Sequence, residues 1–156
     1  MIRRIWGPAV SQLCRIIYCS RSLLKGSRSD IETHIRRILA TARTNNPQAG
    51  LTGAMAFTES CFAQVLEGEH ENLSCLFQKI RSDSRHTDVK ILARSNTRER
   101  LFASWSMAYV DTPYGHGHPL AHFSFEAALI DGAAPQALEL LKVLRRAAVA
   151  GPKSAD

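Results

Sequence analysis

The sequence contains no run of eighteen apolar residues, so it predicts no membrane-spanning helix. It also has no internal repeat and no low-complexity segment. Two arginines stand near its start, but Gly7, Pro8 and Arg15 interrupt the apolar core that a signal peptide needs. These absences favour a cytoplasmic protein. A length of 156 residues, 45% of them apolar and 22% charged, indicates one ordinary globular domain and excludes wholesale disorder.

Cysteine is scarce and occurs in no CxxC pair. The four cysteines stand at positions 14, 19, 61 and 75, a spacing that favours reduced thiols over a metal site or a disulfide framework. Cys14 and Cys19 are five residues apart, so they lie on opposite faces if both belong to one strand.

Basic residues outnumber acidic ones, 20 to 14, which gives a formal net charge of +6. A basic surface attracts anions such as phosphates, nucleic acids or acidic partners. The charge alone therefore keeps a nucleic-acid-binding module among the candidate functions.

Hydrophobic periodicity predicts strands and helices in alternation. The expected strands cover residues 13–19, 51–58, 62–67, 89–93 and 105–109, and the expected helices cover 30–44, 69–81, 121–131 and 135–149. Ser29 and Glu32 form a predicted capping box at the start of the first helix, and Pro47 is expected to follow its end.

The order β-α-β-β-α-β, followed by one more strand, is typical of a ferredoxin-like α/β sandwich. Right-handed crossovers place the first two helices on one face of the sheet. Two further helices are expected near the C-terminus. In the last of them, Ala137, Leu141, Leu144 and Ala148 form an apolar stripe that packs on the free face of the sheet or on another subunit.

A glutamine interrupts the apolar strand at residues 62–67. Gln64 lies on the same face as Phe62 and Leu66, so its amide needs buried hydrogen-bond partners. Because the first and third strands pair at the centre of this fold, Tyr18 is a candidate partner. The pair is either a structural hydrogen bond or part of a functional site.

Two further groups of polar residues have both a structural and a functional interpretation. Asn45 and Asn46 can end a helix, or present an amide to an imide or a nucleobase edge. A second group, at the end of the second helix, is either a solvated terminus or a binding site for a hydroxylated or phosphorylated tail: Lys79, Asp83, Arg85 and His86. Three histidines at 116, 118 and 122 lack cysteine or carboxylate neighbours, so no metal site is predicted.

Five motifs in this order resemble those of the BLUF family, blue-light sensors that use FAD. They are IIYCS at 16–20, NNPQAGLTGAM at 45–55, CFAQVLEGE at 61–69, DSRH at 83–86 and WSM at 105–107. The resemblance covers about residues 13–110. It implies a flavin held non-covalently between the first two helices, FAD by family habit, with FMN also possible.

The resemblance also implies roles for individual residues. Tyr18 is the expected photoactive tyrosine, and Gln64 is the glutamine that rearranges and changes the hydrogen bond to the flavin C4=O. Asn46, with Asn45, binds the C4=O/N3 edge. Trp105 and Met107 are the pair in the fifth strand that exchange places near Gln64. Four residues are expected to contact the outer edge and the tail of the flavin: Lys79, Asp83, Arg85 and His86.

The implied domain organisation is a leader at 1–12, a flavin-binding domain at 13–110, a linker and helical cap at 111–150 and a tail at 151–156. No cyclase or EAL-type motif follows position 110, so a short stand-alone sensor without enzymatic activity is expected. Its C-terminal helices are expected to self-associate and to dock a separate effector protein.

Two other functions remain as alternatives. A ferredoxin-like nucleic-acid-binding module needs exposed aromatics on the sheet, and the third strand offers Phe62 but no run of the kind RRM domains use. A small hydrolase needs a nucleophile with a base, and no such grouping has a suitable neighbourhood.

Overall fold

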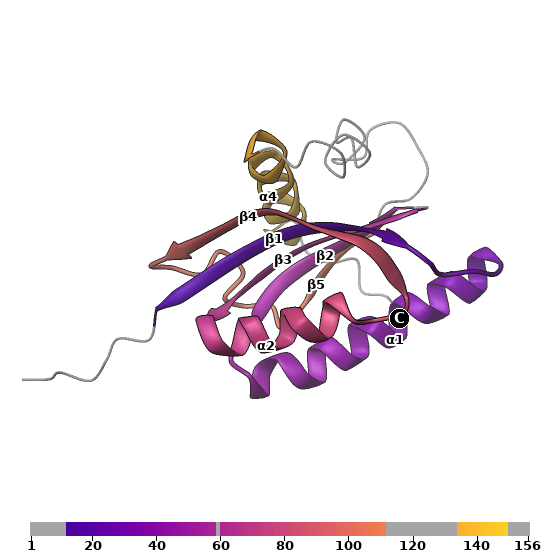
Figure 1. Cartoon of the computed structure of the whole chain (residues 1–156), viewed down its shortest axis with the longest axis horizontal. Helices are drawn as coiled ribbons and strands as arrows, with labels where there is room; N and C mark the ends of the chain where they lie inside the picture. The colour runs from indigo at the N-terminus through magenta and orange to yellow at the C-terminus, as the bar shows by residue number, and fades with distance from the viewer. Residues whose placement is uncertain (1–11, 59, 112–133, 150–156) are drawn as a thin grey trace, which may run out of the picture.

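The computed structural model describes residues 12–58, 60–111 and 134–149. The elements follow the chain in the order shown in Figure 1: β1 (Leu13–Ser22), α1 (Arg28–Gln48), β2 (Thr52–Thr58), β3 (Cys61–Glu69), α2 (His70–Arg81), β4 (His86–Thr97), β5 (Ala108–Asp111) and α4 (Ala134–Val149).

The five strands form one sheet in the order β4-β1-β3-β2-β5. Strand β3 is central and runs antiparallel to both β1 and β2, while β5 pairs in parallel with β2. The register places Tyr18 of β1 directly opposite Gln64 of β3. The predicted pairing of the first and third strands is therefore confirmed.

Helices α1 and α2 lie on one face of the sheet, and α4 lies on the other (Figure 1). Each face has its own core. The core under α1 and α2 includes Ile16, Leu66 and Leu73, and the core under α4 includes Val65, Phe102 and Leu140. The predicted ferredoxin-like α/β sandwich is confirmed, and the last predicted helix packs on the free face of the sheet.

The start of α1 differs from the prediction. The cap is Ser27, whose hydroxyl accepts the Asp30 N–H at 3.2 Å, while the Asp30 carboxylate accepts the Ser27 N–H at 2.8 Å. Gly26, at φ 121°, turns the chain just before this cap, in a conformation that glycine adopts readily. Ser29 and Glu32, the predicted capping pair, lie inside the helix.

The end of α1 also differs, because the helix continues through Pro47 to Gln48. Proline removes only one backbone donor, and the helix ends within two residues of it. The N–H groups of Ala49, Gly50 and Leu51 donate to the carbonyls of the last turn, which stabilises this end.

The last strand of the sheet begins later than predicted. Residues 105–107 lie in an irregular segment, and β5 starts only at Ala108. The Trp105 carbonyl accepts the Gly53 N–H at 3.1 Å, while side chains of α1 hold the carbonyls that follow it. The alternation expected for a strand therefore does not apply to Trp105 and Met107.

Several predictions fall outside the described residues: the leader as far as residue 11, the helix at 121–131, the histidines at 116, 118 and 122, and the tail. Within the described part, no helix is long and apolar enough to cross a membrane, and no cluster of three metal-ligating side chains occurs.

All four thiols are free, as predicted, and Cys14 and Cys19 face the two different cores. Burial raises the pKa of Cys19 to about 12, and the neighbouring Cys61 adds to the effect. The Cys19 thiol is therefore protonated and unreactive at neutral pH.

Candidate functional site

A cavity of about 250 Å³ opens between α1, α2 and the sheet. Its walls combine apolar side chains of both helices with amide groups from α1 and β3 and charged groups at the rim. The lining residues are Tyr18, Ile38, Thr41, Ala42, Asn45, Asn46, Met55, Phe62, Gln64, Leu76, Lys79, Ile80, Asp83, Arg85, His86 and Met107. Every predicted site residue except Trp105 is among them.

Three buried side chains form a hydrogen-bonded chain in the wall of this cavity. The Tyr18 hydroxyl donates to Oε1 of Gln64, and Nε2 of Gln64 donates to the Met107 sulfur at 3.5 Å. Tyr18 is 4% exposed, Gln64 7% and Met107 3%. The predicted contact between Tyr18 and Gln64 is thus present.

The partners of Gln64 determine how its amide is oriented. A thioether sulfur only accepts hydrogen bonds, so the NH₂ end of Gln64 points toward Met107 and the oxygen toward the Tyr18 hydroxyl. If the amide rotated by half a turn, its oxygen would face a sulfur that cannot donate. Leaving a buried polar group without its hydrogen bond costs about 1–3 kcal/mol, so this orientation is the favoured one.

Tyr18 is held as a neutral phenol. Burial raises its pKa above the ordinary value, and the neighbouring Cys19 and Asp83 raise it further. The ring packs edge-on against Phe77 of α2, with centroids 5.5 Å apart. The hydroxyl therefore keeps its proton at neutral pH and serves as the donor to Gln64.

Asn46 and Asn45 differ in their surroundings, although they are neighbours in α1. Asn46 is buried, and its Nδ2 donates to the Ser106 carbonyl at 2.7 Å, whereas Asn45 is exposed at the rim of the cavity. An amide has a second N–H and an oxygen, so Asn46 can also serve a ligand with both a donor and an acceptor.

The rim of the cavity carries the charged residues predicted for this region. Arg85 forms a two-pronged ion pair with Asp83, with Nε 2.9 Å from Oδ1 and Nη2 2.5 Å from Oδ2. The hydrogen bonds from Arg85 lower the pKa of Asp83. Lys79 is exposed beside them, on the last turn of α2.

His86 connects the rim to two elements. Its Nδ1 lies 2.8 Å from the hydroxyl of the buried Ser20, and its Nε2 hydrogen-bonds the Ile80 carbonyl at the end of α2. Because a carbonyl only accepts, Nε2 carries a proton. The residue thus joins α2 to β1 at the edge of the cavity.

Trp105 is the one predicted site residue that lies elsewhere. It packs against the core under α4, with its ring 6.4 Å from that of Phe102. Met107, two residues later, points into the cavity beside Gln64. The two side chains lie on opposite sides of the sheet because the segment between them is not a strand.

Two residues that hold the chain between β4 and β5 were not singled out by the sequence. Arg43 of α1 donates from Nε to the Met107 carbonyl at 3.1 Å. It stands among several helix arginines, so its spacing gave no signal. Glu67 of β3 is fully buried on the α4 face. The signal that could have found it is a charged residue at the end of a mostly apolar strand. Gln64 was noticed for the same reason, as a polar residue among apolar ones.

The lining of the cavity suits a planar ligand with three kinds of surface. Much of the helix wall is apolar, Gln64 of β3 and Asn46 of α1 offer amides, and the rim carries the cations Lys79 and Arg85. A flavin has an aromatic ring system, an imide edge and a phosphate-bearing tail, which match these surfaces. The residues present therefore fit a flavin.

A ferredoxin-like sandwich with a cavity whose lining fits a flavin is the arrangement of a flavin-binding protein. The chain belongs to the BLUF family, because residues 13–108 match the family described as "Sensors of blue-light using FAD".

Individual relatives agree with this assignment. The chain is 33% identical over 113 residues to the photoactivated adenylate cyclase subunit beta of Euglena longa, a match that covers 69% of this chain and 13% of that protein. Among solved structures, the ground state of BlsA superposes with a TM-score of 0.71 at 29% identity, covering 85% of this chain and 87% of BlsA. The dark state of BlrB, a BLUF protein, gives 0.68 at 25% identity, covering 90% and 97%.

Proposed function

We propose that this protein is a blue-light photoreceptor in which Tyr18, Gln64 and Met107 form the switch. It binds a flavin, FAD by preference, without a covalent bond. The observation that carries the proposal is the hydrogen-bonded chain of these three side chains in the cavity wall. The sensor has no substrate of its own, and light is its input.

Different cavity residues would bind different parts of the flavin. Asn46 and Gln64 would bind the imide edge through their amides, with Asn45 contributing at the rim. Arg85 and Lys79 would attract the phosphates of the tail, while Asp83 and His86 hold Arg85 and the end of α2 in place. Bound flavin supplies the absorption of blue light and, once excited, an acceptor for one electron.

Tyr18 would give one electron to the excited flavin, and its phenolic proton would pass to Oε1 of Gln64, the atom that accepts its hydrogen bond. Without the hydroxyl donor, the amide of Gln64 loses the partner that fixed its orientation, and it can rotate or tautomerise. When the electron and the proton return, Tyr18 would be a neutral phenol again, while the rearranged Gln64 would offer the flavin a different hydrogen-bonding atom. A stronger hydrogen bond there shifts the absorption to the red.

The change passes from Gln64 to the segment at residues 104–107. The rotated amide directs an oxygen toward Met107, which cannot donate a hydrogen bond to it. An indole N–H only donates, so Trp105 is a better partner than Met107 for the rotated amide. An exchange of the two side chains would therefore accompany the rotation, and Trp105 would leave the core under α4.

Movement of Trp105 changes the surface against which α4 packs, so α4 is the proposed output element. It would dock a separate effector protein or a second copy of the chain. A nucleic-acid-binding module is less compatible with the described structure, since α1 and α2 cover one face of the sheet and α4 packs on the other.

The decisive test replaces Tyr18 with Phe. Tyr18→Phe removes the hydroxyl but keeps the ring, so the purified variant is expected to remain yellow and to lose the reversible red shift. Tyr109→Phe makes the same chemical change on β5, outside the cavity lining, and should keep the full shift. A complete photocycle in Tyr18→Phe would defeat the mechanism.

A further inference from the structure

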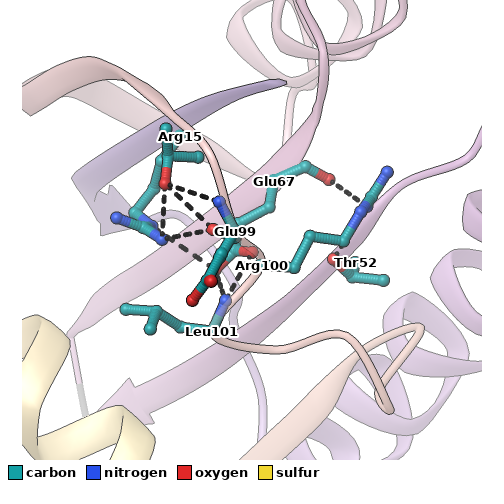
Figure 2. Close-up of polar contacts among 7 residues, drawn as sticks. Arg15, Thr52, Glu67, Glu99, Arg100 and Leu101 are labelled. Atoms are coloured by element: carbon teal, nitrogen blue, oxygen red, sulfur yellow. Dashed lines mark hydrogen bonds and ion pairs between the residues drawn. The ribbon is translucent and has the colours of Figure 1, made fainter. Parts of the chain in front are cut away.

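Glu67 is the only fully buried carboxylate among the described residues, and it lies on the face of β3 that points away from the cavity. Figure 2 shows the groups that surround it. The backbone N–H of Leu101 lies 3.1 Å from Oε1 and 2.9 Å from Oε2, and Nε of Arg15 lies 3.4 Å from Oε1. Every one of these partners is a donor, as a carboxylate requires.

The same region is tied together by a second guanidinium, that of Arg100 (Figure 2). Its Nη1 donates to the Thr52 hydroxyl at 2.9 Å and to the Glu67 carbonyl at 3.1 Å, and its Nη2 donates to the Gly50 carbonyl at 2.7 Å. The chain just after β4 is thus fastened, immediately before Leu101, to the start of β2 and to β3 near its end.

Residues 98–107, the connecting segment between β4 and β5, contain neither helix nor strand. Their backbone N–H groups therefore lack the partners that a regular element supplies. The Glu67 carboxylate takes the place of a neighbouring strand by accepting the N–H of Leu101. Burial raises the pKa of this carboxyl, against the lowering effect of Arg15 and of the amides of Leu101 and Phe102.

The connecting segment carries the side chains that matter at the cavity. From Leu101 it continues into Phe102, whose carbonyl accepts the Trp105 N–H at 3.0 Å. Two residues later Met107 reaches Gln64. The position of Leu101 therefore helps to determine which side chain of the segment lies beside the glutamine.

We propose that Glu67 is a positioning residue: by holding the connecting segment through the Leu101 amide, it keeps Trp105 in the core under α4 and Met107 beside Gln64. The functional meaning of this inference rests on the proposed function, because Glu67 would stabilise the positions of Trp105 and Met107 before illumination. It does not require that flavin be bound.

The sequence contains two tryptophans, Trp6 and Trp105. The experiment uses the full chain with Trp6→Phe, so that Trp105 is the one tryptophan left. Glu67→Gln keeps the size of the side chain but leaves one acceptor oxygen instead of two. Glu69→Gln makes the same change at an exposed position at the end of β3 and is the matched control.

The first readout is the quenching of Trp105 fluorescence by acrylamide in the flavin-free protein. Glu67→Gln should increase the quenching and should speed hydrogen exchange at the Leu101 amide by about tenfold, the factor expected when one hydrogen bond to a charged group is lost. Glu69→Gln should change neither. Unchanged quenching and exchange in a folded Glu67→Gln protein would overturn the proposal.

The second readout is the rate of dark recovery with flavin bound. If Glu67 favours the resting arrangement, recovery in Glu67→Gln should slow by about tenfold. An unchanged rate overturns the link to the switch. A wild-type chain without any red shift would defeat the proposed function, while the flavin-free readouts would still test the role of Glu67.

If Glu67→Gln does not fold, hydrogen exchange at the Leu101 amide of the wild-type chain tests the proposal instead. The Leu101 amide should then be protected to within about tenfold of the Val65 amide in the central strand, although it lies outside every strand. Exchange of Leu101 as fast as that of an exposed loop would overturn the proposal.

Discussion

Gln64 and Glu67 are three residues apart on β3, and both are buried, but they lie on opposite faces of the sheet. Glu67 is held by a backbone amide and a guanidinium, groups that can only donate. Gln64 lies between a phenol, which can donate or accept, and a thioether, which accepts weakly.

The comparison shows how one strand can combine a fixed contact with a changeable one. A carboxylate surrounded by donors has a single satisfied arrangement, so it holds its neighbours in place. An amide beside weak or two-way partners has a second arrangement only about 1–3 kcal/mol above the favoured one, so a change in Tyr18 can interconvert them. On this account the cavity face of β3 carries the switch and the α4 face carries its support.

The largest expected effect comes from removing the changeable amide. Gln64→Leu should abolish the light-induced red shift, because leucine has no group that can rearrange its hydrogen bonds. Gln78→Leu, an exposed position on α2, should leave the shift intact. Absorption spectra recorded before and after blue light measure the shift in both variants. A normal shift in Gln64→Leu would contradict the claim that the cavity face of β3 carries the switch.

The next effect concerns the stability of the α4 face. Leu140→Ala should lower the free energy of unfolding by about 2–5 kcal/mol, because Leu140 is fully buried between α4 and the sheet. Leu138→Ala, on the exposed side of the same helix, should change it by less than about 0.5 kcal/mol. Urea unfolding curves make the comparison, and equal effects would mean that α4 does not pack as described.

A smaller effect is expected at the weak partner of Gln64. Met107→Leu preserves the volume but removes the sulfur acceptor, so the resting orientation of the amide loses stability. Dark recovery should slow by a factor of about two to five, as expected for the loss of a weak hydrogen bond. Met55→Leu, also in the cavity wall, is the control, and the same change in both variants would argue against a role for the sulfur.

The smallest effect is a pH dependence at the fixed contact. Because burial raises the pKa of Glu67 in the folded state, the folded protein binds more protons there than the unfolded chain between the two pKa values. This carboxyl therefore contributes more stability as the pH falls from neutral toward the ordinary glutamate pKa of 4.5. The free energy of unfolding of the wild type, measured relative to Glu67→Gln, should rise over that range, and a fall would contradict the assignment.

Sequence reasoning reached the central strands and the Tyr18–Gln64 contact, because the strand pattern and the fold together fix which residues are opposite each other. It missed the end of α1, where Pro47 is tolerated since the helix ends within two residues. It also placed Trp105 in a strand. Hydrogen bonds from side chains distant in sequence, such as those of Asn46 and Arg43, keep that segment irregular, and local patterns do not reveal them.

The buried Glu67 illustrates the same limit. Its partners Arg15 and Leu101 are 52 residues before and 34 residues after it, so no local spacing connects them. The predicted binding residues at the rim were easier to find, since Asp83, Arg85 and His86 are close together in the sequence. Their distribution between a loop and the start of β4 required the structure.

The light-minus-dark absorption spectrum of the purified wild-type chain with bound flavin tests the central claim most directly. A rearranging Gln64 predicts a small red shift under blue light that reverses in darkness, with the flavin chemically unchanged at the end of the cycle. A protein that takes up flavin into this cavity and shows no reversible shift would contradict the account.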